Sequence, residues 1–233
     1  MPDLKFGGVY LPCNVEAPSS LSRPKRKLQA FSVPGRSGDI ILMEDAYENY
    51  AQDYNINFSD DVLSVAENAD DLAKKLFLDG YQKLEDSFEP GVFRWAYFEG
   101  PFDIENLMKI AGRAKIRFIC KPQRFLTSGE TVVTKNASGT ITNPTQCASK
   151  PLLRIYGTGT FTINGVAITV ASHGQSYVDV DCEMMDCYNG ATSLNEYVSF
   201  SGNDFPVLSP GSNSFTFGTG ITQVRITPRW WKL

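Results

Sequence analysis

The stretch Phe205-Pro206-Val207-Leu208-Ser209-Pro210-Gly211-Ser212-Asn213 decides how the end of this chain folds. Two prolines and a glycine predict a tight turn, because proline fixes φ and glycine tolerates positive φ. Asn213 is able to bond its own backbone, which favours the same turn. The residues after it alternate as a strand does, and the chain closes on Pro228-Arg229-Trp230-Trp231. Nothing in this segment has the pattern of a catalytic site, so it indicates an assembly or binding protein.

The second half of the chain is a series of short predicted strands. They are predicted at 152–156, 160–163, 166–170, 176–182, 198–200, 214–217 and 223–226. Asn164-Gly165 between two of them is a strong signal for a two-residue hairpin. Many short strands with closely spaced turns indicate a β-sandwich. Because residues 126–148 are rich in Thr, Ser, Gly and Asn, we expect a boundary near Ser128, with domains over 1–128 and 129–233.

The first half predicts an α+β domain, mainly β, with one helix packed on its sheet. Residues 29–50 have the pattern strand, turn, strand, with glycines at the turn. A helix is predicted over Asp70–Leu78, where Leu72, Leu76 and Phe77 fall on one face. Asn68, Asp70 and Asp71 are expected at its N-terminal end, and Gly80 is placed to end it. Further strands are predicted at 54–58, 81–84, 93–98 and 113–120, the last ending before Lys121-Pro122.

The composition is that of an ordinary globular protein: 233 residues, 42% of them hydrophobic and 21% charged. A formal net charge of −4 disfavours a general nucleic-acid-binding protein, because binding to phosphates needs clustered lysine and arginine. No apolar stretch approaches the roughly 20 residues of a spanning helix, and the N-terminus lacks a secretory pattern. The five cysteines are scattered and odd in number, so free thiols are expected. We therefore expect no membrane association and a protein kept in the cytosol unless a larger assembly carries it out.

Residues 178–184 hold the main candidate for catalytic chemistry. Period-two alternation predicts Asp179, Asp181 and Glu183 on one face of a strand, with Cys182 and Met184 on the other. A glycosidase needs two carboxylates about 5 to 10 Å apart, and residues two apart on a strand approach that spacing. The wet face of an antiparallel strand explains the same pattern, and nothing nearby indicates a buried acid with a raised pKa. A cation site here would need further oxygen ligands.

The remaining candidates for chemistry are a histidine and a pair of cysteines. His173, the only histidine, lies in the predicted turn Ala171-Ser172-His173-Gly174, with no nucleophile motif nearby. Cys182 and Cys187 lack the tight spacing of a zinc site. We therefore predict no catalytic residue, no metal, no cofactor, and a protein that is not an enzyme.

Two patches of opposite charge are candidate contacts between copies of the chain. The basic patch contains Arg23, Lys25, Arg26 and Lys27, and the acidic patch contains Asp60, Asp61, Asp70 and Asp71. Solvated surface is the ordinary explanation of such runs. In a self-assembling ring, however, opposite patches on one subunit meet head to tail across each interface.

Aromatic residues support an alternative function from another class, a carbohydrate-binding protein that recognises host wall polysaccharide. Trp230, Trp231, Tyr156 and Tyr177 are the candidate residues for stacking on sugars. Because adjacent residues on a strand face opposite ways, one of the two tryptophans is expected to be buried and the other more exposed.

A succession of short motifs carries a family resemblance along nearly the whole chain. The motifs are Val33-Pro34-Gly35-Arg36-Ser37-Gly38, Phe118-Ile119-Cys120-Lys121-Pro122, Asn143-Pro144-Thr145 leading to Pro151, Val180-Asp181-Cys182-Glu183, the segment from Phe205 to Asn213, and Pro228-Arg229-Trp230-Trp231. In this order, with a helix in the first half, they resemble the distal tail proteins (Dit) of long-tailed, non-contractile bacteriophages.

The resemblance implies a structural hub at the tip of the phage tail. The N-terminal domain is then expected to close into a homo-hexameric ring, and the C-terminal domain to be a galectin-like β-sandwich. The implied partners are the tail tube protein, the tail-associated fibre or lysin protein and receptor-binding proteins, with DNA passing through the ring only in transit. The implied location is the virion tail tip, after assembly in the cytoplasm of the host bacterium.

Overall fold

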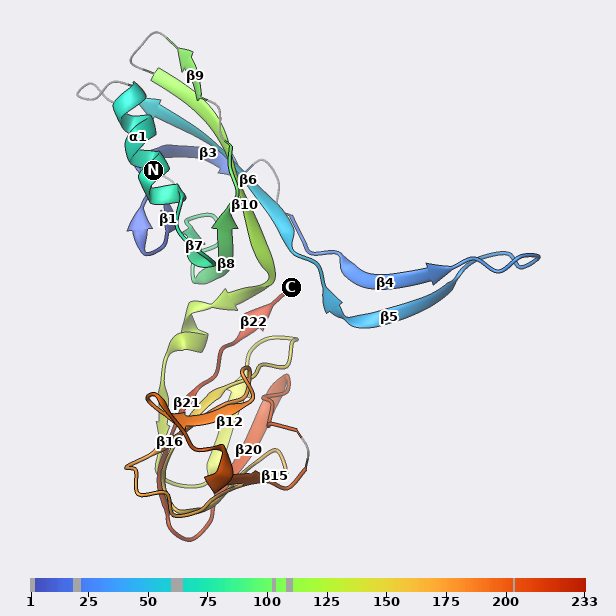
Figure 1. Ribbon diagram of the computed structural model, residues 1–233, viewed down its shortest axis with the longest axis vertical. Helices are drawn as coiled ribbons and strands as arrows, with labels where there is room; N and C mark the ends of the chain where they lie inside the picture. The colour runs from blue at the N-terminus through green and yellow to red at the C-terminus, as the bar shows by residue number, and fades with distance from the viewer. Residues whose placement is uncertain (1–2, 19–21, 60–64, 102–103, 108–110, 203) are drawn as a thin grey trace. The chain divides into compact units, whose positions relative to one another are not determined.

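The protein is described here by a computed structural model that covers residues 3–18, 22–59, 65–101, 104–107, 111–202 and 204–233 (Figure 1). The chain divides into two compact units, Met1–Arg124 together with Leu233, and Phe125–Lys232. Each unit has its own core of buried apolar side chains. The chain is mainly β with one α-helix, which confirms the predicted fold class.

The first unit is built on one antiparallel sheet. Its elements are β1 (Leu4–Phe6), β2 (Val9–Tyr10), β3 (Asn14–Pro18), β4 (Arg26–Phe31), β5 (Ile40–Tyr47), β6 (Tyr50–Ser59), α1 (Val65–Leu76), β7 (Gln82–Asp86), β8 (Val92–Phe98), β9 (Ile104–Leu107) and β10 (Ala111–Leu126). The sheet has the order β2-β1-β7-β8-β10-β6-β3, with β9 also paired to β10. Strands β4 and β5 form a separate two-stranded sheet, as the predicted hairpin requires.

The helix lies earlier in the chain than its predicted span. It covers Val65–Leu76 rather than Asp70–Leu78, so Asn68 and Asp70 lie inside it and do not cap it. Short polar residues favour caps but are tolerated within a helix, which explains the error. The predicted apolar face is correct for Leu72 and Leu76, which are fully buried against the sheet, whereas Phe77 follows the helix and is exposed.

Strand β10 is longer than predicted. It continues through Lys121-Pro122, where the sequence indicated an end. The ladder between β10 and β6 runs from Ala111 opposite Ser59 to Cys120 opposite Tyr50. Pro122 therefore lies beyond the residues paired with β6, where a missing N–H breaks none of those hydrogen bonds.

The second unit consists of two antiparallel sheets. Its elements are η1 (Thr127–Glu130), β11 (Val133–Lys135), β12 (Gly139–Asn143), β13 (Leu152–Gly157), β14 (Gly159–Ile163), β15 (Val166–Val170), β16 (Val178–Asp181), β17 (Asp186–Asn189), β18 (Thr192–Ser193), η2 (Asn195–Tyr197), β19 (Val198–Phe200), β20 (Gly211–Phe217), β21 (Ile221–Thr227) and β22 (Trp231–Lys232). One sheet has the order β11-β21-β13-β16-β17-β18 and the other β12-β20-β14-β15-β19. The short strands β11, β12, β17 and β18 were not predicted, because turn residues surround them in the sequence.

The two sheets of the second unit enclose one core. Leu153, Ile155 and Val224 from the first sheet pack in the same cluster as Phe161 and Phe215 from the second. Side chains from two inner faces that share one core define a β-sandwich. The hairpin from β14 to β15 turns at Asn164-Gly165, where both residues have positive φ, of 48° and 84°, as predicted for this dipeptide.

The turn before β20 is held by the side chain of Asn213. This side chain is fully buried, and its Nδ2 donates to the carbonyls of Ser209 and Gly211, each at 2.9 Å. Its Oδ1 accepts from Nδ2 of Asn164 at 2.6 Å. The same amide therefore closes its own turn and ties that turn to the β14–β15 hairpin.

Candidate interaction surfaces

The β4–β5 hairpin, residues Arg26–Tyr47, holds most of the exposed large apolar side chains in the described part of the first unit; we call it the arm. Six of its large apolar side chains are between 45% and 58% exposed: Leu28, Phe31, Ile40, Ile41, Leu42 and Met43. In the described part of the chain, neither β4 nor β5 pairs with a third strand, and Figure 1 shows the two running side by side.

Both faces of the arm are apolar. Leu28 lies opposite Met43 and Ala30 opposite Ile41, while Gln29 lies opposite Leu42 and Phe31 opposite Ile40. Since successive residues of a strand point to opposite faces, each face carries at least three apolar side chains. Apolar side chains on both faces are characteristic of a strand that other parts of a protein cover on both sides. A two-stranded hairpin is also marginally stable alone, so the arm has the properties of a surface that is covered by a partner.

The basic patch of the sequence lies at the base of the arm. Arg26 and Lys27 begin β4, and Arg23 and Lys25 precede it; all four are exposed. In the acidic patch, Asp70 and Asp71 lie on α1, and Asp71 pairs with Lys75 at 2.8 Å. Asp60 and Asp61 lie outside the described residues. The head-to-tail pairing of these patches stays a prediction.

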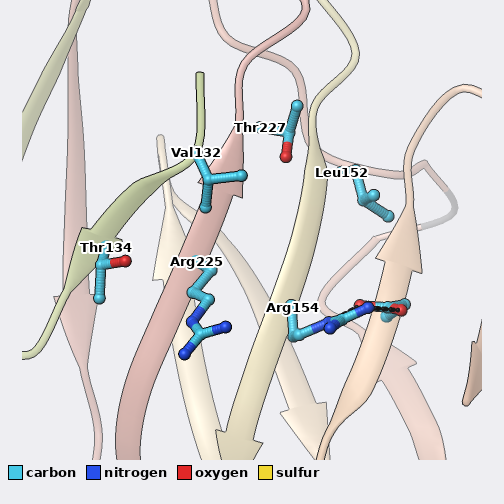
Figure 2. Close-up of a pocket in the computed structure, with 7 residues that line it drawn as sticks. Val132, Thr134, Leu152, Arg154, Arg225 and Thr227 are labelled. Carbon is cyan, nitrogen blue, oxygen red and sulfur yellow. Dashed lines mark hydrogen bonds and ion pairs between the residues drawn. The ribbon is translucent and has the colours of Figure 1, made fainter. Parts of the chain in front are cut away.

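A pocket of about 450 Å³ lies on the outer face of the larger sheet of the second unit (Figure 2). Its lining consists of Val132, Thr134, Leu152, Arg154, Asp179, Arg225 and Thr227. Arg154 binds Asp179 through two hydrogen bonds, of 2.7 and 2.8 Å, which Figure 2 draws as dashed lines. The pocket therefore combines apolar, hydroxyl and guanidinium groups.

The four candidate sugar-stacking residues have different environments. Tyr156 and Tyr177 lie together, with ring centroids 5.7 Å apart. Arg154 stacks on Tyr177 at 4.1 Å and Arg225 on Tyr156 at 5.3 Å. Trp230 is only 5% exposed and packs in the core, so its ring has no face open to a sugar. Trp231 is half-buried, and its Nε1 donates to the carbonyl of Ala148 at 2.9 Å.

The candidate carboxylates of β16 form ion pairs. The expectation of a wet face is wrong for Asp179 and Asp181, which are 3% and 2% exposed. Arg229 binds Asp181 at 2.7 and 2.8 Å. Burial acts to raise the pKa of Asp181, but hydrogen bonds from Arg229 and from backbone N–H groups outweigh burial and lower it. Because Arg229 holds the Asp181 carboxylate ionised, Asp181 has no proton to donate, which disfavours general acid catalysis by this residue.

The last two positions of that predicted alternation also differ from expectation. Strand β16 ends at Asp181, so Glu183 and Met184 lie in the following turn and both are exposed. Met184, which was expected on the buried face, is 70% exposed. Period-two alternation applies only as long as the chain remains a strand.

His173 and the cysteines have environments that favour structural roles. Nδ1 of His173 accepts from the backbone N–H of Gln175 at 3.2 Å within the loop after β15. Cys13, Cys120, Cys182 and Cys187 are free thiols, as expected. Burial raises the pKa of the Cys120, Cys182 and Cys187 thiols to about 12, so the reactive thiolate is scarce. Among the described residues, no group of His, Cys, Asp and Glu side chains is arranged to hold a metal ion, and no helix has the length and apolarity to span a membrane.

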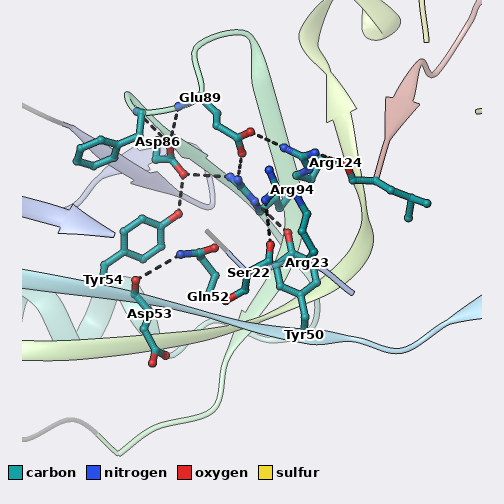
Figure 3. Close-up of polar contacts among 12 residues, drawn as sticks. Ser22, Arg23, Tyr50, Gln52, Asp53, Tyr54, Asp86, Glu89, Arg94 and Arg124 are labelled. Atoms are coloured by element: carbon teal, nitrogen blue, oxygen red, sulfur yellow. Dashed lines mark hydrogen bonds and ion pairs between the residues drawn. The ribbon is translucent and has the colours of Figure 1, made fainter. Parts of the chain in front are cut away.

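A buried ionic network lies in the first unit (Figure 3). Arg94 of β8 donates to Tyr50 at 3.1 Å, to Asp86 at 3.0 Å and also to Glu89. Asp86 accepts a further hydrogen bond of 2.6 Å from Tyr54, whose pKa is raised by burial and by Asp86, so the phenol keeps its proton. Glu89 also accepts from Arg124. Every one of these charges has a partner, and the network fixes the turn between β7 and β8.

Sequence reasoning missed the arm as a surface, and it missed Arg94, Arg154 and Arg225. A signal for the arm was present in Ile40-Ile41-Leu42-Met43, because an unbroken apolar run predicts a strand covered on both faces. For the arginines the only signal was a charged residue inside a strand pattern, as in Val92-Phe93-Arg94. Their partners lie far away in the sequence and give no local pattern.

Comparison with known proteins identifies the fold. Neither a scan against protein-family models nor a search of curated proteins gave a match. The chain is similar to the crystal structure of the SPP1 Dit protein, described as a paradigm of the hub adsorption apparatus in phages that infect Gram-positive bacteria. The alignment covers 100% of both chains with a TM-score of 0.74 and 13% sequence identity. The chain therefore has a Dit-like fold, as its sequence motifs predicted.

Proposed function

We propose that this protein is a structural component of the tail tip of a long-tailed, non-contractile phage, where it acts as the hub of the host-adsorption apparatus. The Dit-like fold supports this proposal, because the likeness extends over the full length of both chains. The paired carboxylates and the buried thiols support a structural protein rather than an enzyme.

The observation that carries the proposal is the two-faced apolar arm. A large apolar side chain contributes about 1.5–3 kcal/mol when fully buried. The six arm side chains are already about half buried, so each has about 1 kcal/mol left to gain, or about 6 kcal/mol per arm. Association costs at least several kcal/mol, so a single arm gives a contact that depends on concentration.

A closed ring makes such a contact strong. In a homo-hexamer each copy inserts its arm against one neighbour and receives the arm of another, so the last contact to form is intramolecular. The basic residues at the base of the arm and the acidic residues on α1 give this head-to-tail contact its orientation. Each copy has one arm and one surface that receives a neighbour's arm. Both are occupied in every copy only when the ring closes.

The ring then joins the parts of the tail tip. One face contacts the tail tube protein, the other the tail-associated fibre or lysin protein, and the galectin-like second unit is directed toward receptor-binding proteins. DNA crosses the ring only in transit. The protein assembles in the cytoplasm of the host bacterium and remains in the virion.

The test is the assembly state of the purified full chain, measured by native mass spectrometry and negative-stain microscopy over a range of concentrations. The double variant Ile41→Asp, Leu42→Asp places one charge on each face of the arm. The control Met184→Asp places a charge on an apolar residue of the second unit that is 70% exposed, more than either arm residue. We expect rings for the wild type and the control, and monomers for the arm variant. Rings that persist in the arm variant would refute the role of the arm, and a wild type that stays monomeric at all concentrations would refute the ring.

A further inference from the structure

On the outer face of the larger sheet in the second unit, the strand register places side chains of neighbouring strands directly opposite one another. Across the pair β13–β21, Leu152 lies opposite Thr227, Arg154 opposite Arg225 and Tyr156 opposite Gln223. Across β13–β16, Arg154 lies opposite Asp179. Arg225 is also opposite Thr134 of β11. The row through the middle of the face is therefore Thr134, Arg225, Arg154 and Asp179, on four neighbouring strands.

Two arginines directly opposite each other conflict with the usual rule for strand pairing. Like charges in this position destabilise a sheet. Arg154 is neutralised by its two hydrogen bonds to Asp179, so the pair keeps one excess positive charge, on Arg225. Positions that break a local rule without compensation are expected at functional sites.

Arg225 has only neutral contacts in the part of the chain that the structure describes. Its Nε donates to Oε1 of Gln223 at 3.2 Å, and its guanidinium lies 5.3 Å from the centroid of the Tyr156 ring. No carboxylate among the described residues forms an ion pair with it. These contacts orient the side chain on the face and leave its charge without an anion.

The pocket beside Arg225 has a mixed lining (Figure 2). Val132 and Leu152 provide apolar surface, while Thr134 and Thr227 provide hydroxyl groups. Its volume of about 450 Å³ lies in the usual range for small-molecule sites, roughly 300–1,000 Å³. An apolar wall, two hydroxyls and one unpaired guanidinium match a ligand with C–H surface, hydroxyl groups and a single acid group.

We propose that this pocket binds one acidic sugar unit. The acid group accepts hydrogen bonds from the guanidinium of Arg225, sugar hydroxyls bond to Thr134 and Thr227, and the C–H face of the ring lies against Leu152. A polyanion such as nucleic acid is disfavoured, because Asp179 lies in the same row and the chain has a net charge of −4. The proposal uses only the second unit, so it does not depend on ring formation.

The acid group is a carboxylate or a phosphate, since the arginine guanidinium donates paired hydrogen bonds to both. The test therefore uses the full chain with two acidic probes, glucuronic acid and glucose 6-phosphate. Glucose is the neutral control and inorganic phosphate is the control for simple anion binding. Saturation-transfer NMR detects which sugar is bound and gives its dissociation constant, and inorganic phosphate, which has no C–H protons, is measured by its displacement of glucose 6-phosphate.

Two variants of equal charge change locate the site. Arg225→Gln removes the unpaired guanidinium, and Lys150→Gln removes an exposed lysine that lines a separate hollow. We expect at least one acidic probe to bind in the millimolar range, and Arg225→Gln to weaken that binding about tenfold or more, since it removes charge-assisted hydrogen bonds. Lys150→Gln is expected to leave the dissociation constant unchanged. Binding of glucuronic acid identifies the acid group as a carboxylate, and binding of glucose 6-phosphate identifies it as a phosphate.

Stability separates a binding role of Arg225 from a structural one. Because Arg225 is exposed and its described contacts are one hydrogen bond to Gln223 and the ring of Tyr156, the urea midpoint of Arg225→Gln is expected to stay close to that of the wild type. The proposal is overturned if neither acidic probe saturates, if glucose binds as tightly as the acidic probes, or if phosphate alone binds as tightly as glucose 6-phosphate. Equal binding by Arg225→Gln and the wild type, or a clear loss of stability in Arg225→Gln, also overturns it.

Discussion

Replacing Arg94 by methionine measures how much the buried ionic network contributes to the first unit. The guanidinium is 1% exposed and Asp86 is 4% exposed, so solvent screens their interaction very little. Methionine fills the space of the side-chain stem but offers no hydrogen-bond donor. The change therefore leaves Asp86 and Glu89 in place without the cation between them.

The magnitude follows from what remains around the two carboxylates. Removing one partner of a buried pair costs about 3–5 kcal/mol, because a buried charge loses its compensation. Asp86 still accepts from Tyr54 and from the backbone N–H groups of Phe88 and Glu89, at 2.6, 3.0 and 2.9 Å. Glu89 still accepts from Arg124. We therefore expect a loss at the lower end, about 3 kcal/mol, which is a large share of the 5–15 kcal/mol typical of a domain.

Hydrogen exchange in increasing urea is the suitable assay, because it follows the two units separately within the full chain. Peptides from β7 and β8 are expected to lose about 3 kcal/mol of protection in Arg94→Met, while peptides from β13 and β16 do not change. The matched control is Arg113→Met, since Arg113 is also in a strand of the sheet but its side chain is 63% exposed and pairs with Glu16 at 3.4 Å. An exposed pair contributes about 0–1 kcal/mol. Equal losses in the two variants would refute the assignment of the network as a buried stabilising element.

Two further predictions concern a pH-dependent ion pair and a close backbone approach. Hydrogen bonds from Arg117, and then from Lys115, lower the pKa of Asp53 from its ordinary value of 3.8 to about 2. Since the folded pKa is lower than the unfolded one, this stabilisation is complete above about pH 4 and is lost as the pH falls toward 2. Asp53→Asn is expected to cost about 1 kcal/mol in urea unfolding at pH 7, because both cations are largely exposed, and the difference from wild type should disappear near pH 2; a difference independent of pH would contradict the ion pair. Gly220 has a φ of +91° and a Cβ there would lie 2.1 Å from the carbonyl oxygen of Thr158, so Gly220→Ala should destabilise the second unit by about 3 kcal/mol. The control is Gly190→Ala, at φ +59° with open space around the Cβ, which should cost only about 1 kcal/mol. Thermal unfolding measures both variants, and equal costs would show that the close approach at Gly220 has no effect.

The local features of this fold could be predicted from the sequence because they depend on a few neighbouring residues. Asn164-Gly165 determined a hairpin, since both positions need positive φ, and alternating apolar residues determined the strands on either side. The arm was predicted as strand, turn and strand for the same reason. The order of weak motifs from Val33 to Trp231 was sufficient to indicate the Dit-like fold.

The polar sites were decided by the tertiary structure. Asp179 and Asp181 alternate in the sequence like residues of a solvated face, yet arginines 25 and 48 residues away bury and neutralise them. Arg154 and Arg225 become opposite neighbours only through the register of β13 and β21. Backbone periodicity and turn chemistry act over a few residues, whereas strand register depends on the packing of side chains from the whole unit. For this reason the sequence by itself specified the longer strands, the presence of one helix and the fold, and only the packed sheets decided which charges are paired and which arginine is left without an anion.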